Sequence, residues 1–296
     1  MIVVVCGVTA SGKSKIAQNI AALLNCDILN GDAFQVYKEL NIGVNKPDSE
    51  TIQKFRYHLI DFLPADTAFS IANYQKMARK IINDKLSLNE HLVIEGGSGL
   101  YLRSLLFDYE FAEKNDEFLD DYDSMNNDEL FSILAKRDPE SAATIHINNR
   151  KRVIRALRIF DETGITKSQA IKMQQHNLIF PNVHFVALEV ARKELYAKIN
   201  DRVNIMWQRG LKNEVIELLK IFPPDLQSLQ AIGYKETIQG ILSDQSDDEI
   251  IALIQKNTRN YAKRQITYFK HQLPVFFFNA EDDITKYIRS SINGPF

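Results

Sequence analysis

Residues 7–14 read G-V-T-A-S-G-K-S and match the phosphate-binding pattern G-x-x-x-x-G-K-[ST] at every defined position. An apolar, β-branched run precedes them at residues 2–6, and apolar residues at helical spacing follow over residues 13–24. The order of strand, glycine-rich loop and helix predicts that backbone N–H groups and a helix N-terminus surround a phosphate, with a point charge from Lys13 and a Mg²⁺ ligand in Ser14. The residues expected to contact the phosphates are Gly7, Thr9, Ala10, Ser11, Gly12, Lys13 and Ser14.

Further apolar runs typical of buried strands recur along the chain. They lie at residues 27–29, 91–94, 184–188 and 275–278. Helical patterns separate most of them, and two long ones cover residues 193–219 and 247–271. The sequence therefore predicts an α/β fold with a P-loop NTPase-like core, in which helices flank a mainly parallel sheet.

Strand signals vanish between about residues 107 and 181. This stretch opens with an acidic, poorly periodic segment and continues as several predicted helices from residue 127 to about residue 175. The acidic residues are Asp116, Glu117, Asp120, Asp121 and Asp123. We therefore expect a core domain of residues 1–106 and 182–296, with C-terminal helices packed on it, and a helical insertion domain of residues 107–181.

Composition and charge limit the kinds of protein and partner. Hydrophobic residues make up 45% of the 296 residues and charged residues 25%, as in ordinary soluble globular proteins, and two cysteines exclude a disulfide framework or a cysteine-rich zinc site. The run at residues 2–6 is too short for a signal peptide and nothing targets a membrane, so we expect a cytoplasmic location and, without an evident protein partner, a monomer. The net charge of −2 gives no global attraction to a polyanion, so nucleic-acid binding would depend on local basic patches.

The phosphate loop by itself leaves open whether the ligand is a nucleoside triphosphate or another diphosphate ester. An ATP-dependent enzyme needs an acidic residue that closes a second apolar strand and organises Mg²⁺. Glu95, which follows the apolar run at residues 92–94, could do this. A P-loop kinase or ATPase is therefore one interpretation of this sequence.

Short segments along nearly the whole chain resemble those of the tRNA dimethylallyltransferases, also called tRNA isopentenyltransferases. In chain order they are I-L-N-G-D-A-F-Q-V-Y at 28–37, I-G-V-N-K-P at 42–47, Y-H-L-I-D at 57–61, G-G-S-G-L-Y at 96–101, D-P at 138–139, R-V-I-R-A-L at 152–157, R-V at 202–203 with Met206 and G-L at 210–211, A-I-G-Y-K-E at 231–236 and T-R-N-Y-A-K-R-Q at 258–265. Many short matches in one order are more specific than a single phosphate loop.

The sequence departs from that family's pattern at a few positions. Ala33 stands in place of a serine, Val44 and Asn45 in place of a Thr-Ala pair, Ser98 in place of a threonine and Tyr268 in place of a tryptophan. Ser98 keeps the hydroxyl group that a threonine would offer. Glu95 occupies a position that is often apolar in the family, and the sequence leaves open whether it faces the site.

The resemblance implies transfer of a dimethylallyl group from dimethylallyl diphosphate to N6 of an adenosine beside the anticodon in tRNA, with release of diphosphate. It implies Asp32 as the general base, Ser98 as a catalytic hydroxyl and Arg202 as a further cation on the diphosphate. The amine proton becomes acidic only as the nitrogen–carbon bond forms, so Asp32 would act late. Mg²⁺ is the expected cofactor, and the expected partners are dimethylallyl diphosphate and the anticodon stem-loop of tRNA.

Two of these residues, Asp32 and Ser98, and the nearby Gln35 also have simpler interpretations. Asp32 could cap a helix that starts near Phe34, and Ser98 could belong to a turn between glycines. Gln35 could hydrogen-bond the adenine edge as substrate tRNA binds, or be a solvated helix residue.

An adenine stacked in an RNA loop must be extruded to reach a buried diphosphate, so the enzyme would need RNA contacts. Two predicted helices carry basic residues on one face, although such a face is often only solvated surface. The candidates are Lys151, Arg155 and Arg158 in the insertion, and Arg259 and Lys263 near the C-terminus in a stripe that also holds Lys256 and Lys270. Two further alternatives remain: prenylation of free adenine nucleotides, for which basic helices are unnecessary, and an RNA-binding protein whose loop serves only as a switch.

Overall fold

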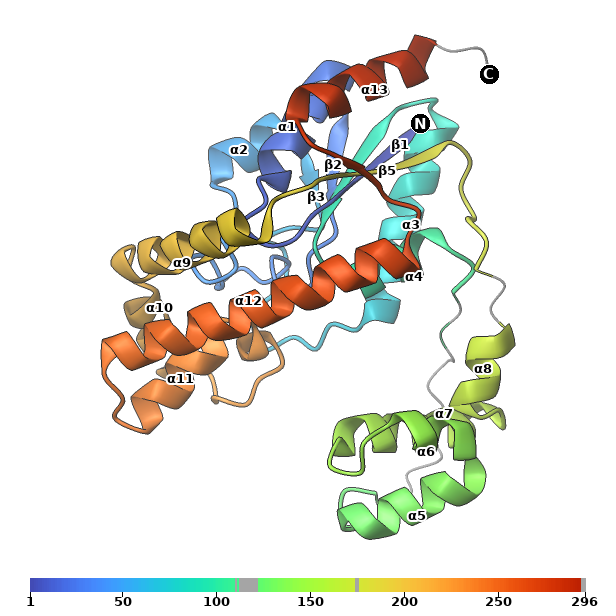
Figure 1. Ribbon diagram of the computed structural model, residues 1–296, viewed down its shortest axis with the longest axis vertical. Coiled ribbons are helices and arrows are strands. Elements are labelled where there is room, and N and C mark those ends of the chain that lie inside the picture. The colour runs from blue at the N-terminus through green and yellow to red at the C-terminus, as the bar shows by residue number, and fades with distance from the viewer. Residues whose placement is uncertain (110, 112–121, 174–175, 294–296) are drawn as a thin grey trace. The chain divides into compact units, whose positions relative to one another are not determined.

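The computed structural model describes residues 1–109, 111, 122–173 and 176–293. The chain divides into two compact units (Figure 1). The larger unit comprises Met1–Leu105 and Phe180–Phe296, and the smaller one comprises Leu106–Ile179. Each unit has an apolar core of its own.

The larger unit is built on a six-stranded sheet with the order β3-β2-β4-β1-β5-β6, and every pairing between neighbouring strands is parallel. All residues of the central strands β1, β2 and β4 are buried, as expected for strands covered by helices on both faces. The predicted α/β class is confirmed. The strands are β1 (Ile2–Cys6), β2 (Asp27–Asn30), β3 (Tyr57–His58), β4 (Leu92–Gly96), β5 (Val183–Leu188) and β6 (Phe276–Phe278).

The strand order places helices on both faces of the sheet. The chain moves across the sheet in one direction from β1 to β2 and in the other direction from β3 to β4. Since crossovers between parallel strands are right-handed, α1 (Lys13–Leu24) and α3 (Ile71–Ser87) lie on opposite faces. α13 (Glu281–Asn293) shares the face of α1, where Ile284 joins Ile20 in one apolar cluster (Figure 1).

The C-terminal helices α9 (Arg192–Gln208) and α12 (Asp247–Gln272) pack against each other. They lie beyond the carboxyl ends of the sheet's strands (Figure 1). Residues 193–219 are helical, as predicted, and form two helices, because Gly210, at φ 98°, separates α9 from α10. The remaining helices of this unit are α2 (Ser49–Lys54), α4 (Gly99–Leu106), α10 (Leu211–Leu219), α11 (Tyr234–Leu242) and the short 3₁₀ helix η1 (Ser228–Gln230).

The smaller unit is helical. It contains α5 (Asn127–Arg137), α6 (Pro139–Thr144), α7 (Arg150–Thr163) and α8 (Lys167–Met173). α7 buries Val153 and Leu157 against Leu134 of α5 and leaves Lys151 and Arg155 exposed. The helices predicted from residue 127 onward are therefore confirmed up to residue 173. Most of the predicted acidic segment lies outside the described residues.

Two local features differ from the sequence-based expectation. Residues 33–36 form a turn, so the helix predicted to start near Phe34 is absent. Strand β3 was not predicted, because two half-buried residues are too short to produce an alternating pattern. Among the described residues, no helix is both long enough and apolar enough to cross a membrane.

Asp27 anchors the end of the sheet that lies away from the phosphate loop. Its carboxylate is 5% exposed and contacts Arg56, His58 at 2.8 Å and Lys85 at 2.7 Å. Burial raises the pKa of Asp27, but hydrogen bonds from these three side chains outweigh burial and lower it to about 2. This cluster stabilises the fold and takes no part in the candidate site.

Candidate active site

Three loops meet at the carboxyl edge of the sheet. They follow the neighbouring strands β1, β2 and β4, whose register pairs Cys6 with Gly96 and Asn30 with Glu95. Parallel strands end at the same edge, so the phosphate loop, the segment after Asn30 and the segment after Gly96 converge there. They border a cavity of about 340 Å³, whose lining includes Thr9, Lys13, Ser14, Asp32, Ser98 and Arg202.

The phosphate loop has the conformation of an anion-binding nest. Ala10 and Gly12 have φ values of 64° and 87°, and the N–H of Ser11 turns back to the carbonyl of Val8 at 3.2 Å. Residues with left-handed backbone turn successive N–H groups toward one concave side. The loop leads directly into α1, so the partial positive charge at the helix N-terminus adds to these donors.

Two cations of the cavity lie close enough to influence each other. Burial lowers the pKa of Lys13, the nearby charge of Arg202 lowers it further, and the carboxylates of Glu95 and Asp32 oppose both effects. Burial also lowers the pKa of Arg202, and Asp32 opposes this. A bound anion would relieve the repulsion between the two cations, so their arrangement favours a polyanionic ligand such as a diphosphate.

A tight turn positions Asp32. Its Oδ1 accepts hydrogen bonds from the N–H groups of Phe34 at 2.9 Å and Gln35 at 3.4 Å, while its own N–H donates to Oδ1 of Asn30 at 3.0 Å. The amide of Asn30 in turn donates to the carbonyl of Leu59 at 2.8 Å. The other carboxylate oxygen, Oδ2, has no hydrogen-bond partner among the described residues and remains available to accept a proton.

The loops after β2 and β4 touch through their backbones. The N–H of Gly31 donates to the carbonyl of Glu95 at 2.7 Å. A Cβ atom added at Gly96 would lie 2.7 Å from the carbonyl oxygen of Gly31, so no larger residue fits at Gly96 without a backbone shift. This contact fixes how close the Asp32 turn lies to the Ser98 segment.

Gln265 of α12 joins the phosphate loop to the segment after β4. Its Oε1 accepts the N–H of Thr9 at 3.1 Å, and its Nε2 donates to the carbonyl of Gly97 at 2.8 Å. The side chain is 6% exposed. Tyr261, one turn earlier, lines the cavity; burial raises the pKa of its phenol, which hydrogen bonding with Ser98 and Gln265 partly offsets.

The phosphate loop, a carboxylate and clustered cations around one cavity resemble the machinery of an enzyme that transfers a group from a diphosphate, and comparisons with known proteins agree. A family model described as IPP transferase matches residues 35–272. The chain belongs to the IPP transferase family.

Relatives in this family are similar over nearly their whole length. The tRNA dimethylallyltransferase of Anoxybacillus flavithermus is 40% identical over 284 residues, 95% of this chain and 91% of that one, and the Bacillus subtilis protein of the same name is 38% identical over 94% of this chain and 90% of its own. The crystal structure of a tRNA delta(2)-isopentenylpyrophosphate transferase from Staphylococcus epidermidis is 36% identical, with a TM-score of 0.73 over 99% of this chain and 98% of that one. A eukaryotic dimethylallyltransferase structure, 24% identical, has the same fold with a TM-score of 0.86 over 100% of this chain and 80% of that one.

In this member of the IPP transferase family, Gln35 lines the cavity but is already engaged. Its Nε2 donates to the carbonyls of Val44 at 3.1 Å and Asn45 at 3.2 Å. A bidentate contact with adenine needs both the donor and the acceptor of the amide. Adenine recognition by Gln35 therefore stays a prediction that requires these two contacts to open.

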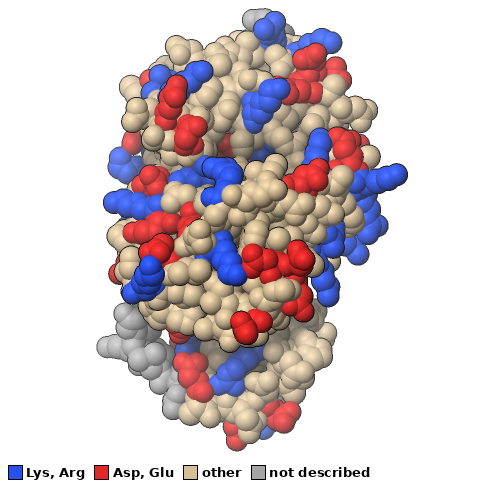
Figure 2. Space-filling model, turned by 90° about the vertical axis from the view of Figure 1, so that its left-hand side faces the viewer, with Lys and Arg blue, Asp and Glu red and all other residues tan. Residues whose placement is uncertain are grey.

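The basic residues predicted to contact tRNA have different surroundings. Lys151 and Arg155 are exposed on α7, and Arg155 lies 3.4 Å from Glu162. Arg158 pairs with Asp123 at 3.3 Å. Near the C-terminus, Arg259 donates to Asn200 at 2.6 Å. On the face of the molecule in Figure 2, basic and acidic side chains are intermixed, so binding of a polyanion would depend on local groups.

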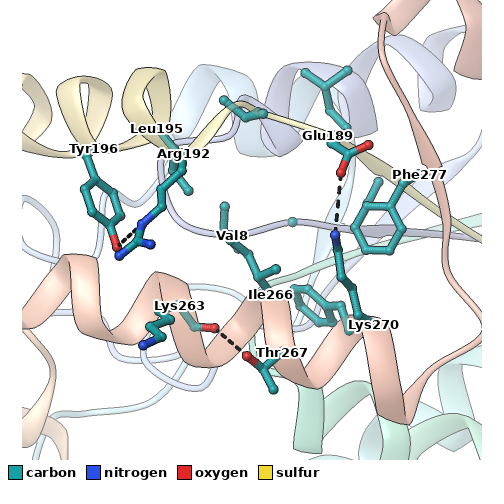
Figure 3. A pocket seen from close by; sticks show the side chains of 15 residues that line it. Val8, Glu189, Arg192, Leu195, Tyr196, Lys263, Ile266, Thr267, Lys270 and Phe277 are labelled. Carbon is teal, nitrogen blue, oxygen red and sulfur yellow. Dashed lines mark hydrogen bonds and ion pairs between the residues drawn. The ribbon is translucent and has the colours of Figure 1, made fainter.

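Lys263 lies at a second cavity, of about 310 Å³, which Gly7 and Val8 of the phosphate loop also line (Figure 3). Its apolar wall includes Val8 and Ile266, and its rim holds a pair formed by Glu189 and Lys270 at 3.5 Å. Arg264, the next residue along α12, lines the first cavity instead. An RNA contact by Lys263 stays a prediction, and Lys263 does not line the cavity that contains Asp32.

Several residues of the first cavity were not assigned from the sequence. Tyr261, Arg264 and Gln265 belong to the T-R-N-Y-A-K-R-Q segment that carries the family resemblance. Their helical spacing alone did not show which of them face a cavity. The only sequence signal for them was that resemblance.

Proposed function

We propose that this protein transfers a dimethylallyl group from dimethylallyl diphosphate to N6 of an adenosine next to the anticodon in tRNA and releases diphosphate. One observation carries the proposal: the phosphate loop, the cations Lys13 and Arg202 and the carboxylate of Asp32 border the same cavity. The relatives at 38–40% identity are named tRNA dimethylallyltransferases, which supports the same reaction.

In the reaction, the N6 nitrogen forms a bond to C1 of the dimethylallyl group while the bond from C1 to the diphosphate oxygen breaks. The electron pair of the broken bond leaves with the diphosphate. Lys13, Arg202 and the N–H groups of the phosphate loop stabilise the negative charge that develops on this leaving group. Oδ2 of Asp32 accepts the proton that N6 loses, and Ser98 lies in the same cavity as a hydroxyl partner for the reacting groups.

The site fits Mg²⁺ held mainly by its substrate. The hydroxyl oxygen of Ser14 lies 2.5 Å from a carboxylate oxygen of Glu95, so hard oxygen ligands are present beside the phosphate loop. The described residues contain no group of three or more histidine, cysteine or acidic side chains that could hold a metal by themselves. Mg²⁺ commonly binds through one or two protein oxygens together with substrate phosphates, and when bound it would neutralise charge on the diphosphate.

Asp32→Asn tests the proposed base, because asparagine keeps the Oδ1 acceptor that holds the turn and removes the proton acceptor. With radiolabelled dimethylallyl diphosphate, Mg²⁺ and unmodified tRNA, we expect kcat to fall about 10²- to 10⁴-fold while the Kd for tRNA changes little. Asp66→Asn, at an exposed aspartate, is the matched control and should retain activity. Wild-type kcat in the Asp32→Asn enzyme would show that Asp32 is not the base.

The same assay separates the alternative functions. Parallel reactions contain AMP in place of tRNA, or ATP with either acceptor. Label in tRNA alone supports the proposal, and label in AMP alone indicates prenylation of free nucleotides. Release of phosphate from ATP without prenyl transfer would indicate a P-loop kinase or ATPase.

A further inference from the structure

Glu95 is a buried acidic residue at the floor of the phosphate site. It lies near the end of β4, paired in register with Val5 on one side and Asn30 on the other, and is 7% exposed. Oε1 accepts a hydrogen bond from the hydroxyl of Ser14 at 2.5 Å, and Oε2 accepts one from the hydroxyl of Tyr57 at 2.9 Å. The carboxylate thus points toward the first turn of α1, directly behind the phosphate loop.

The fold does not require a carboxylate at this position. The preceding residues of β4, Val93 and Ile94, are apolar and fully buried, and an apolar side chain at residue 95 would continue that pattern. A buried carboxylate is costly unless it is paired or fully hydrogen-bonded. Both observed partners of Glu95 are neutral hydroxyls, and no ion pair to it occurs among the described residues.

The charge of Glu95 opposes binding of a bare diphosphate. The same charge raises the pKa of Lys13, so the carboxylate lies within electrostatic reach of the groups that hold the ligand. The carboxylate of Glu95 and a bound diphosphate, on either side of Ser14, would repel each other. Lys13 offsets part of this repulsion, and a divalent cation at the hydroxyl of Ser14 would offset more of it.

We infer that Glu95 is a positioning residue for Mg²⁺: it holds the hydroxyl proton of Ser14, so that the oxygen lone pairs of Ser14 face the metal, and it supplies charge that the metal neutralises. This inference rests on the proposed diphosphate site. Its consequence is a coupling between two ligands, because Glu95 weakens diphosphate binding without metal and strengthens it with metal.

The coupling is measurable without any prenyl acceptor. The Kd of inorganic pyrophosphate for the full-length protein is measured by calorimetry in EDTA and again with Mg²⁺, and the ratio of the two Kd values is the coupling factor. Glu95→Gln keeps the shape of the side chain and an acceptor oxygen for Ser14 but removes the charge. We expect the coupling factor to fall at least about tenfold, within the range usual for linked ligands, with tighter binding in EDTA and weaker binding in Mg²⁺.

Two further variants show whether Glu95 acts through Ser14. Ser14→Ala should also lower the coupling factor, and adding Glu95→Gln to it should lower the factor little further, because both changes remove one arrangement. Tyr57→Phe removes the other donor to the carboxylate and keeps its charge, so it is the matched control and should retain most of the coupling. Glu95→Asp, which retracts the charge from Ser14, provides the same comparison if the glutamine variant does not fold.

Two outcomes would overturn the inference. An unchanged coupling factor in Glu95→Gln, whether affinity is lost equally in EDTA and in Mg²⁺ or not at all, would mean that the metal does not sense the carboxylate. Additive effects of Glu95→Gln and Ser14→Ala would mean that Glu95 does not act through Ser14. The proposed function fails separately, since an intact coupling factor can coexist with absence of prenyl transfer to tRNA.

Discussion

Replacing Gln265 by leucine tests how strongly one side chain holds the two site loops together. Leucine has nearly the same volume and suits a helix, so the change removes the amide from α12 and little else. It leaves the N–H of Thr9 and the carbonyl of Gly97 without the hydrogen bonds that Gln265 makes at 3.1 Å and 2.8 Å. Gln272→Leu, at an exposed position of the same helix where the amide accepts one surface hydrogen bond from Arg103, is the matched control for any effect on helix formation.

The expected size of the effect follows from those two orphaned groups. Each buried polar group left unpaired costs about 1–3 kcal/mol. Water from the neighbouring cavity can reach the carbonyl of Gly97 and the N–H of Thr9, so the lower half of each range applies. We expect the free energy of unfolding to fall by about 2–4 kcal/mol in Gln265→Leu, a large part of the 5–15 kcal/mol typical of a folded protein.

Urea unfolding followed by the fluorescence of Trp207 measures this loss. Trp207 is the single tryptophan of the chain and lies on α9 in the larger unit, so its signal reports the unit that contains Gln265. Gln272→Leu should change the unfolding free energy by less than about 0.5 kcal/mol, as is usual for surface substitutions. If the two variants lose equal stability, the two hydrogen bonds of Gln265 do not hold the loops.

Two other predictions concern acid stability and RNA binding. The pKa of Asp27 is about 2 in the folded protein and 3.8 in its reference state, so its interactions stabilise the fold by about 2 kcal/mol above pH 5 and are lost as the pH falls from about 4 to 2. Urea unfolding of wild type at pH 5 and pH 2.5 should show this loss, and Asp27→Asn should lack that part of the pH dependence; an equal decline in both proteins would refute the assignment. Replacing Lys151 and Arg155 together by alanine should weaken tRNA binding and lower the slope of log Kd against log salt concentration by about 1–2. Lys172→Ala, at a residue paired with Glu140, is the control and should leave both the affinity and the slope unchanged. An unchanged slope in the double variant would remove α7 as an RNA contact.

The sequence predicted those parts of the molecule that depend on local pattern. The apolar runs within β1, β4 and β5 carry their own signal, because residues that are buried on both faces of a sheet are mostly apolar. The phosphate loop is equally local, since its glycines, Lys13 and Ser14 act within eight consecutive residues. The rule that parallel strands end at one edge then brings Asp32 and Ser98 to that loop.

Other parts depend on contacts that no local pattern contains. Gln265 reaches the phosphate loop across 256 residues of chain, and the helical spacing of α12 does not reveal which face meets that loop. The orientation of Glu95 was left open because a strand residue can face either side of the sheet, and only the partners Ser14 and Tyr57 settle it. The alternative in which Asp32 caps a helix near Phe34 is met only in part: its carboxylate accepts from the N–H groups of Phe34 and Gln35 as a cap would, but the chain continues as a turn.

The backbone contact between Gly31 and Gly96 has a consequence for changing the acceptor of this enzyme. Side chains can be exchanged to widen or narrow a cavity, but main-chain atoms in van der Waals contact leave no such freedom. The spacing from Asp32 to Ser98 is therefore a fixed dimension, to which any new acceptor must conform. Room for a different base has to come from side chains of the cavity that do not take part in this contact, such as Tyr261 and Arg264 of α12.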